Sequence, residues 1–359
     1  MGSDLIMVLM ARLARRRSLL RRMRALKLRA ALKERNRVQT ASLPRMQTDI
    51  AWYYMYASRD RASFIATVSL TPEAFDELLV PFAREYVDLS RRGRGGRPPR
   101  VQDKHAVLAI VLHFYTAAVE HKTLQELFGV ASTTLSRLLR RGEDALSRAL
   151  QCMPAARIKW PSKATQLYWA SKSQEREPLV SGVFVFVDGK SLGVQEPSCA
   201  DLQNAHYNGW LHSLFVTGVL CFGLDGTIIW GRHNCPGFWN DGEMSRRLQE
   251  FLADGSRVAP GIKLASDSAF PVGGLALGRI VTPLKQGNLE RYQTECRLGL
   301  QTMSDCIPSL RQAAEWGMGA VPKVYRQLML PLPFNPALRN TRLSNLFRLC
   351  NYRVRRTGI

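Results

Sequence analysis

The chain has 359 residues, more than one ordinary hydrophobic core holds, and 46% of them are hydrophobic, so we expect a globular protein with more than one domain. It carries 51 Lys and Arg against 29 Asp and Glu, a formal net charge of +22, which predicts a polyanionic partner. Seven scattered cysteines without a C-x-x-C pair argue against zinc ribbons and disulfide frameworks and favour a reducing compartment. The longest apolar run, residues 106–119, is too short to span a bilayer and contains His113, so it predicts a buried core helix and no membrane role.

A basic segment lies near the start of the chain. Residues 11–38 hold 12 Lys or Arg and a single acid, Glu34, and apolar residues recur there at rough helical spacing. This composition fits a nucleic-acid-binding arm or nuclear-import signal, a mitochondrial presequence, or a solvated helix. Asp4 and the scarcity of Ser count against the presequence, so we favour a basic arm.

Residues 46–87 are expected to be helical and amphipathic. Thr71 suits the N-cap of one of these helices, and Pro72 suits its first turn. The Gly-, Pro- and Arg-rich segment 91–100 then predicts a linker. It resembles an AT-hook, whose arginines enter a narrow minor groove, but a basic hinge between helices is the better interpretation.

Residues 122–141 have the pattern of a helix-turn-helix. A short helix with an apolar inner face meets Gly129, and a second helix starts near Ser132 and buries Leu135, Leu138 and Leu139. The second helix would present candidate DNA-contacting side chains to a major groove: Thr133, Thr134, Ser136, Arg137 and Arg140. An ordinary helical hairpin has the same pattern, so DNA contact is the favoured of two interpretations.

After Gly182 the chain changes from helical to strand-rich. The run V-F-V-F-V before Asp188 is apolar on both faces, as a central strand covered by helices requires. The predicted elements that follow are a hairpin from 214–222 and 227–231, a helix over 242–253, a strand over 262–267, a short strand near 280 and helices from about 307 onward. This is the element order of an RNase H-like domain.

Three acidic residues stand in apolar or glycine-bracketed settings. Asp188 ends the first strand, Asp267 ends the strand 262–267, and Glu315 lies in R-Q-A-A-E-W-G-M-G. If the two strands are parallel neighbours, about 4.8 Å apart, their carboxylates can share divalent cations, with Glu315 reaching across from a helix. Two Mg²⁺ or Mn²⁺ ions held there would activate a water or a 3′-hydroxyl for in-line attack on a phosphodiester.

Each of these acids also has a purely structural interpretation. Asp188 before a glycine could be a turn residue, Asp267 could cap the following segment, and Glu315 could pair with Arg311 one helical turn earlier. The order of the three acids on the predicted elements favours the metal site.

At these residues the chain resembles Harbinger-type transposases and their domesticated relatives, which carry a DDE nuclease domain. The resemblance covers roughly residues 70–359 and is most specific from 180 onward. The segments that carry it are F-V-D-G-K-S-L, Y-N-G-W-L-H-S-L-F-V-T-G-V-L (207–220), P-G-F-W-N-D (236–241), S-D-S-A-F-P (266–271), R-Q-A-A-E-W-G-M-G (311–319) and the Leu-Cys-Asn-Tyr helix at 349–352.

The resemblance implies roles for particular residues. Asp188, Asp267 and Glu315 would form the catalytic triad and hold divalent metal, and Asp241 would be a further metal-associated acid. It also implies DNA as substrate, a nuclear location and a separate Myb-like DNA-binding partner, and it allows a homo-oligomer.

The chain departs from the family pattern in three places. Lys190 and Ser191 follow Gly189 where the family commonly has Thr-His, and Lys190 is expected to contact phosphate or to mark drift in a copy no longer mobile. Gly317, Gly319 and Pro322 are expected to weaken or break the helix after Glu315. The abrupt ending T-G-I suggests a truncated end.

The fold class predicted is therefore α/β, with an RNase H-like DDE nuclease domain over 179–359. It is preceded by an all-α helix-turn-helix region over 46–178 and a basic arm over 1–45. The leading function is a metal-dependent DNA endonuclease or transposase whose DNA binding weakens steeply with salt. The alternatives are a domesticated, non-catalytic DNA-binding protein that retains the fold and a nuclease acting on RNA or RNA–DNA hybrids.

Overall fold

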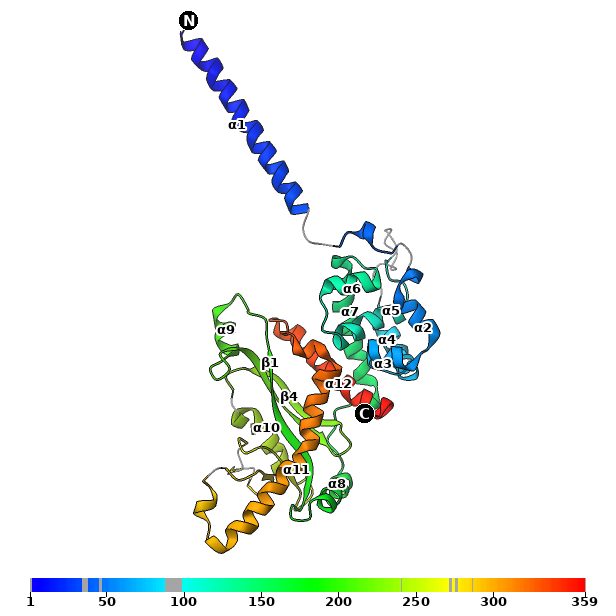
Figure 1. Cartoon of the computed structure of the whole chain (residues 1–359), viewed down its shortest axis with the longest axis vertical. Coiled ribbons are helices and arrows are strands. Elements are labelled where there is room, and N and C mark those ends of the chain that lie inside the picture. The colour runs from blue at the N-terminus through cyan, green and yellow to red at the C-terminus, as the bar shows by residue number, and fades with distance from the viewer. Residues whose placement is uncertain are drawn as a thin grey trace.

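The structure is a computed structural model, and it describes residues 2–33, 38–44, 47–87, 99–239, 241–270, 273–274, 277–285 and 287–358. The first helix, α1 (Gly2–Lys33), extends away from the rest of the molecule in Figure 1. Its Arg15, Arg16 and Arg17 are exposed, as are leucines and methionines such as Leu19 and Met23. The predicted linker at 91–100 falls largely outside the described residues.

A cluster of helices follows α1. Their bounds are α2 (Ala51–Ser58), α3 (Arg61–Val68), α4 (Pro72–Glu85), α5 (Lys104–Thr116), α6 (His121–Phe128), α7 (Ser132–Cys152) and α8 (Lys163–Arg176), with short 3-10 turns at Thr40–Ser42, Gln47–Asp49 and Pro154–Ala156. The hydroxyl of Thr71 accepts a hydrogen bond from the backbone N–H of Ala74 at 3.3 Å, and Pro72 occupies the first turn, so this predicted helix start is confirmed. The predicted core helix is α5, in which residues 106–112 are all buried.

The pair α6 and α7 lies where the sequence predicts two helices. Gly129 ends α6 in the left-handed conformation at φ 60°, which glycine adopts without steric cost. Helix α7 then begins at Ser132 and buries Leu135, Leu138 and Leu139. Its other side packs on α4, α5 and the C-terminal helix, so α7 is the central helix of this cluster.

The second half of the chain forms a six-stranded mixed sheet. Its elements are β1 (Val183–Gly193), α9 (Ala200–His206), β2 (Tyr207–Asn208), β3 (Ser213–Gly223), β4 (Ile228–Pro236), α10 (Asp241–Ala253), β5 (Lys263–Ala265), β6 (Ile280–Val281), 3-10 turns at Leu289–Arg291 and Arg326–Met329, α11 (Thr294–Val324) and α12 (Pro336–Thr357). The spatial order is β4-β3-β1-β5-β6, with β2 also paired to β3. Strands β1, β3 and β4 are antiparallel neighbours, whereas β5 and β6 run parallel to β1.

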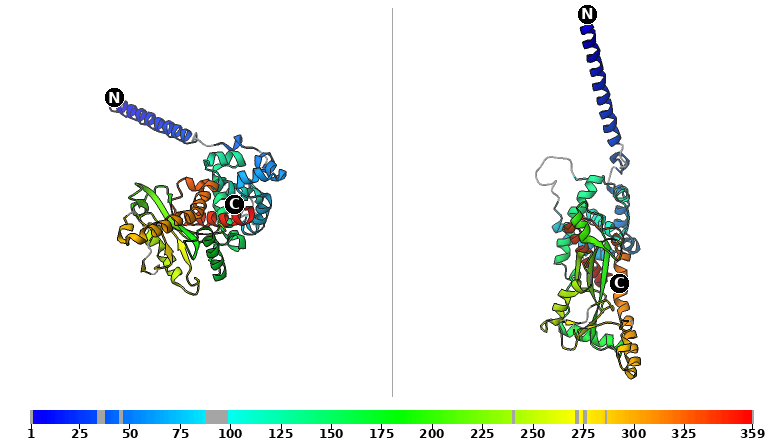
Figure 2. Two further views of the ribbon diagram at one scale, coloured as in Figure 1. Left: turned by 60° about the horizontal axis from the view of Figure 1, so that its bottom comes forward. Right: turned by 90° about the vertical axis from the view of Figure 1, so that its left-hand side faces the viewer.

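Helices cover both faces of this sheet (Figure 2). Val185 and Val187 point to the face covered by α8 and α10, where Leu248 and Leu252 complete a core. The opposite face, with Phe186, is covered by α11 and α12 and is continuous with the core of the helical cluster. This two-sided burial explains why the strand sequence V-F-V-F-V is apolar at every position.

Three sequence predictions about strands and helices were wrong. The strand predicted over 262–267 is only β5 (Lys263–Ala265), so Asp267 lies two residues beyond its end. Strand β1 does not end at Asp188 but continues to Gly193, because β3 pairs with it along the whole stretch from Val185 to Gly193. Helix α11 starts at Thr294 rather than near 307, and it continues to Val324 through Gly317 and Pro322. Gly317 does not break the helix because it lies against Phe222 of β3, where an added Cβ would come within 2.8 Å of the ring.

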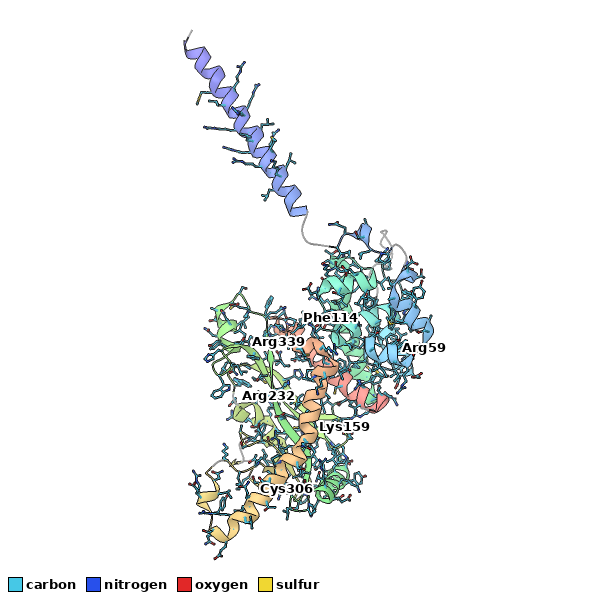
Figure 3. The ribbon with its side chains drawn as sticks, viewed as in Figure 1. Arg59, Phe114, Lys159, Arg232, Cys306 and Arg339 are labelled. Carbon is cyan, nitrogen blue, oxygen red and sulfur yellow. The ribbon has the colours of Figure 1, made fainter. Side chains whose placement is uncertain are left out.

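The C-terminal helix α12 joins the sheet to the helical cluster. The buried Arg342 pairs with Glu143 of α7, with 2.8 Å between its Nε and the carboxylate Oε1, and Asn351 bonds both backbone groups of Ile228 in β4. Near its start, Arg339, which is labelled in Figure 3, bonds Asn234 and, at 3.2 Å, the ring of His206. The boundary predicted at 178/179 stays a prediction, since α12 has contacts on both sides of it.

Candidate functional site

Asp188 lies on β1 just beyond the five buried residues 183–187. Its side chain is 22% exposed, and its Oδ1 accepts a hydrogen bond from the backbone N–H of Gly189 at 3.0 Å. Because side chains alternate along a strand, Asp188 leaves the sheet on the same face as Phe186, the face covered by α11. The carboxylate is therefore at the border between the apolar core and solvent.

Asp267 follows the strand that pairs with β1. Phe186 of β1 pairs with Ala265 of β5 in parallel register, and Asp188 and Asp267 each come two residues later. Because β5 ends at Ala265, Asp267 lies in the loop beyond that strand, whereas Asp188 is still on β1. Asp267 is half-buried, and its Oδ1 accepts the backbone N–H of Ala269 at 3.1 Å.

Helix α11 brings a cation to this edge. The Nη2 of Arg311 is 3.8 Å from Oδ1 of Asp188, and the Arg311 side chain is only 11% exposed. Sequence reasoning considered Arg311 only as a partner for Glu315 and missed its position beside Asp188. The two residues are 123 positions apart, so only the packing of α11 on β1 shows the contact.

Glu315 and Asp241 are placed by their backbones alone. Glu315 lies on α11 one helical turn after Arg311, and Asp241 is the first residue of α10. Their side chains lie outside the part of the chain that the structure describes. Among the described side chains, no group of three His, Cys, Asp or Glu is arranged to hold a metal ion, and the four-residue metal site stays a prediction.

The predicted DNA-contacting residues lie in two places. On the first turns of α7, Thr133, Ser136, Arg137 and Arg140 are exposed and Thr134 is half-buried. Lys190 lies on β1 two residues after Asp188, half-buried and on the same face of the sheet. Lys190 is thus the predicted phosphate contact nearest along the chain to the carboxylates.

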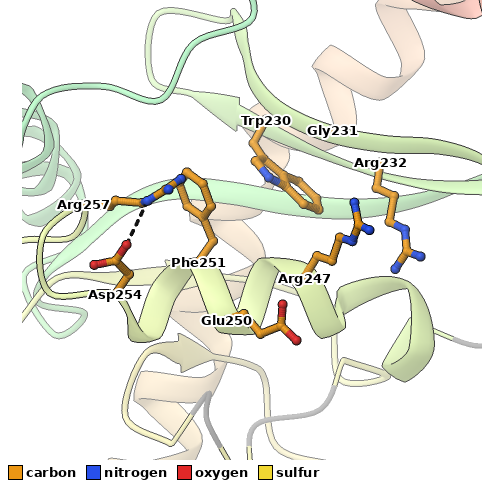
Figure 4. Close-up of a pocket in the computed structure, with 8 residues that line it drawn as sticks. All are labelled: Trp230, Gly231, Arg232, Arg247, Glu250, Phe251, Asp254 and Arg257. Carbon is orange, nitrogen blue, oxygen red and sulfur yellow. Dashed lines mark hydrogen bonds and ion pairs between the residues drawn. The ribbon is translucent and has the colours of Figure 1, made fainter.

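The sequence also missed a basic and aromatic cavity on the other face of the sheet. It lies between β4 and α10 and is lined by arginines and aromatic rings (Figure 4). Its residues are spread over 28 positions of the chain, from Trp230 to Arg257, on β4, on α10 and in the turn that follows α10. A local motif could not have predicted it.

The cysteine thiols are not expected to act as nucleophiles at this site. All seven cysteines are free, and burial raises the pKa of the Cys221 thiol well above its usual range, so that thiol is unsuited to nucleophilic chemistry. In the described part of the chain, no helix has the length and apolar character needed to cross a bilayer.

Comparison with known proteins finds one similarity, and it covers the segment that contains both aspartates. No curated protein and no solved structure matches the chain significantly. The family model described as DDE superfamily endonuclease matches residues 187–351, which run from the end of the buried part of β1 into α12 and include Asp188, Asp267 and the whole of α11. This segment of the chain is therefore similar to the endonucleases of the DDE superfamily.

Proposed function

We propose that the protein is a divalent-metal-dependent DNA endonuclease or transposase of Harbinger type. The observation that carries this proposal is that Asp188 and Asp267 each come two residues after the last pair of the parallel strands β1 and β5, inside the segment that matches DDE endonucleases. Two carboxylates on one sheet edge are an arrangement that nucleases use to hold metal ions.

The sheet order supports an RNase H-like assignment. Three antiparallel strands followed by two parallel ones, with a long helix across the face that bears the first aspartate, is the arrangement expected from the predicted element order. The side chain of Arg311 on α11 reaches Asp188, and Glu315 follows Arg311 one turn later. Glu315 is thus proposed as the third carboxylate of the triad, with Asp241 as an additional acid near the site.

The donor chemistry fits Mg²⁺ or Mn²⁺. Carboxylate oxygens are the ligands that these hard cations prefer, and Asp188 is partly exposed, so an ion can reach it. A bound ion would polarise the scissile phosphate and activate the attacking water or hydroxyl. Asp188 and Asp267 would hold the ion, while Lys190 and Arg311 would neutralise phosphate charge beside it.

DNA is the proposed substrate because the chain is strongly basic and presents basic residues in separate places. The net charge of +22, the exposed arginines of α1 and the exposed first turns of α7 all favour a phosphate backbone as partner. The pair α6 and α7 is proposed to act as a helix-turn-helix. A nuclear location, a Myb-like partner and a homo-oligomer are proposed from the family resemblance alone.

Plasmid nicking in Mn²⁺ tests the proposal. The wild-type protein should nick supercoiled DNA, and Asp188→Asn and Asp267→Asn should each reduce the rate at least a hundredfold, because each removes a metal-binding charge. Asp201→Asn, an exposed acid on α9, is the matched control and should retain full activity. Unchanged nicking by Asp188→Asn would contradict the proposal.

Two further outcomes separate the alternatives. DNA binding without cleavage by the wild-type protein, together with no heat of Mn²⁺ binding in calorimetry, would identify a non-catalytic DNA-binding protein. Stronger inhibition of nicking by an RNA–DNA hybrid than by duplex DNA would identify a ribonuclease-like enzyme.

A further inference from the structure

A cavity of about 450 Å³ lies between the edge strand β4 and helix α10, within the size range of ligand pockets. It is lined by Trp230, Gly231, Arg232, Arg247, Glu250, Phe251, Asp254 and Arg257. Figure 4 shows the Trp230 ring projecting from β4 toward α10, with the Arg247 side chain rising from α10 toward it. The cavity opens to solvent, since Arg247 and Arg257 are exposed.

The cavity holds three guanidinium groups and two carboxylates. Arg257 is paired with Asp254, with 2.8 Å between Nε and Oδ2, and Arg232 donates from Nη1 to the backbone oxygen of Glu243 at 3.2 Å. Within the described part of the chain, Arg247 has no hydrogen bond or ion pair. It is therefore the guanidinium most readily available to an anionic ligand.

Aromatic rings accompany these charges. The guanidinium of Arg257 lies 4.3 Å from the centroid of the Phe251 ring, and that of Arg232 lies 4.8 Å from the Trp239 ring. Trp230 and Phe251 are only half-buried although both are large apolar side chains. Flat apolar rings beside guanidinium groups suit a ligand that has both a planar ring and a phosphate.

The cavity is distinct from the aspartate pair. Gly231 pairs with Leu220, and Leu220 pairs with Asp188, so the cavity lies at the same level of the sheet, two strands from Asp188. Trp230 and Arg232 flank Gly231 and point to the α10 face, whereas Asp188 points to the α11 face. A ligand in the cavity would therefore be on the opposite face of the sheet from the Asp188 carboxylate.

We propose that this cavity binds an unpaired nucleotide of a nucleic-acid strand, with the base against Trp230 and the phosphate on Arg247. A duplex keeps its bases stacked inside and can offer the cavity only phosphates, whereas a single strand can offer both groups. This proposal rests on the proposed function in one respect: the nearby site that cuts DNA is itself proposed. Binding itself requires neither metal nor cleavage.

Fluorescence anisotropy of the full-length protein tests the proposal in EDTA, where no cleavage takes place. The probe is a short, labelled, mixed-sequence DNA single strand, with a hairpin duplex of the same sequence as comparison. Arg247→Ala should weaken single-strand binding about tenfold, because it removes a charge-assisted phosphate contact. Arg246→Ala is the matched control, since Arg246 is the adjacent residue on α10, is 71% exposed and does not line the cavity.

Two more variants separate the base from the phosphate. Trp230→Leu should weaken single-strand binding about tenfold but leave duplex binding within twofold, because only the single strand stacks a base. Glu250→Gln should tighten single-strand binding several-fold, because it removes a negative charge beside the phosphate. Thermal unfolding of each variant checks that it is folded, and the exposed positions 247 and 250 keep the test valid if Trp230→Leu fails to fold.

Several results would overturn the proposal. Equal losses in Arg247→Ala and Arg246→Ala would show that only general charge matters. Equal displacement of the probe by polyglutamate and by an unlabelled strand would identify an acidic-protein site. Normal single-strand binding by Arg247→Ala would contradict the cavity proposal and leave the nuclease proposal unaffected. By contrast, loss of plasmid nicking in Asp188→Asn with intact single-strand binding would support both proposals.

Discussion

The guanidinium group of Arg311 lies beside Asp188, whose side chain is proposed to bind a metal ion. Its Nη2 is 3.8 Å from Oδ1 of Asp188, and Nε of Arg311 is buried with no hydrogen-bond partner among the described atoms. A positive charge this close repels an incoming metal ion. Arg311 therefore lowers the affinity of Asp188 for a metal ion.

We expect Arg311→Gln to bind Mn²⁺ more tightly than the wild-type protein, on the order of tenfold, because it removes a like charge next to the metal site. Isothermal titration calorimetry measures the affinity. Lys323→Gln, an exposed cation on the same helix, is the control and should leave the affinity unchanged. Weaker binding by Arg311→Gln would show that Arg311 positions Asp188 rather than opposing the metal.

A second pair of charges holds the two halves of the chain together. The Arg342–Glu143 pair is almost fully buried, with the side chains 9% and 2% exposed. Removing one partner leaves the other charge buried without compensation. Glu143→Gln should therefore lower the free energy of unfolding by about 3 kcal/mol, measured by urea denaturation. On the same helix, Arg148→Ala breaks an exposed pair with Glu85 and should cost less than about 1 kcal/mol.

At the scale of elements, α11 is the helix whose position decides the site. It lies against the sheet at Gly317, where an added Cβ would lie 2.8 Å from ring carbons of Phe222, itself 1% exposed. The buried ring cannot move away without disturbing the core around it. Two residues later, Gly319 has no atom within 4 Å of the position where a Cβ would be.

Substitutions at these two glycines should have opposite effects. Gly317→Ala should destabilise the protein by about 1 to 3 kcal/mol and reduce nicking, because α11 must shift away from β3 and carry Glu315 with it. Gly319→Ala should be neutral or stabilise by up to about 1 kcal/mol, because alanine favours the helix. Thermal unfolding and plasmid nicking measure both effects, and equal destabilisation would show that helix propensity, not packing, dominates.

At the scale of the whole molecule, buried histidines make the fold sensitive to acid. Burial together with the nearby Arg348 lowers the pKa of His233, at the contact between β4 and α12, from 6.5 to about 4. Burial also lowers the pKa of His105, His113, His121 and His206. In each case the folded protein favours the neutral imidazole.

Stability should therefore fall as the pH is lowered. Between pH 6.5 and 4 the unfolded chain binds a proton at position 233 that the folded chain does not, so the contribution is present above pH 6.5 and is lost as the pH falls to about 4. His233 alone would account for up to about 3 kcal/mol. Urea unfolding at several pH values should show a shallower dependence for His233→Gln, and an identical slope would contradict this account.

The sequence by itself predicted several local elements and singled out the two aspartates as candidate metal ligands. The apolar run before Asp188, the cap at Thr71 and the glycine between α6 and α7 act through neighbouring residues, so their effects can be read from a short window. The sequence left the parallel pairing of β1 and β5 as a condition of the metal site, and the structure shows that the two strands are paired in this way.

Only the tertiary structure decided the surroundings of those aspartates. The extension of β1 to Gly193 depends on pairing with β3, and the continuity of α11 through Gly317 depends on Phe222. The Arg311 contact, the α12 bridge and the cavity beside Trp230 each join residues far apart in the chain. Such contacts follow from the packing of whole elements, and the packing energy is spread over many side chains. A short stretch of sequence therefore cannot predict them.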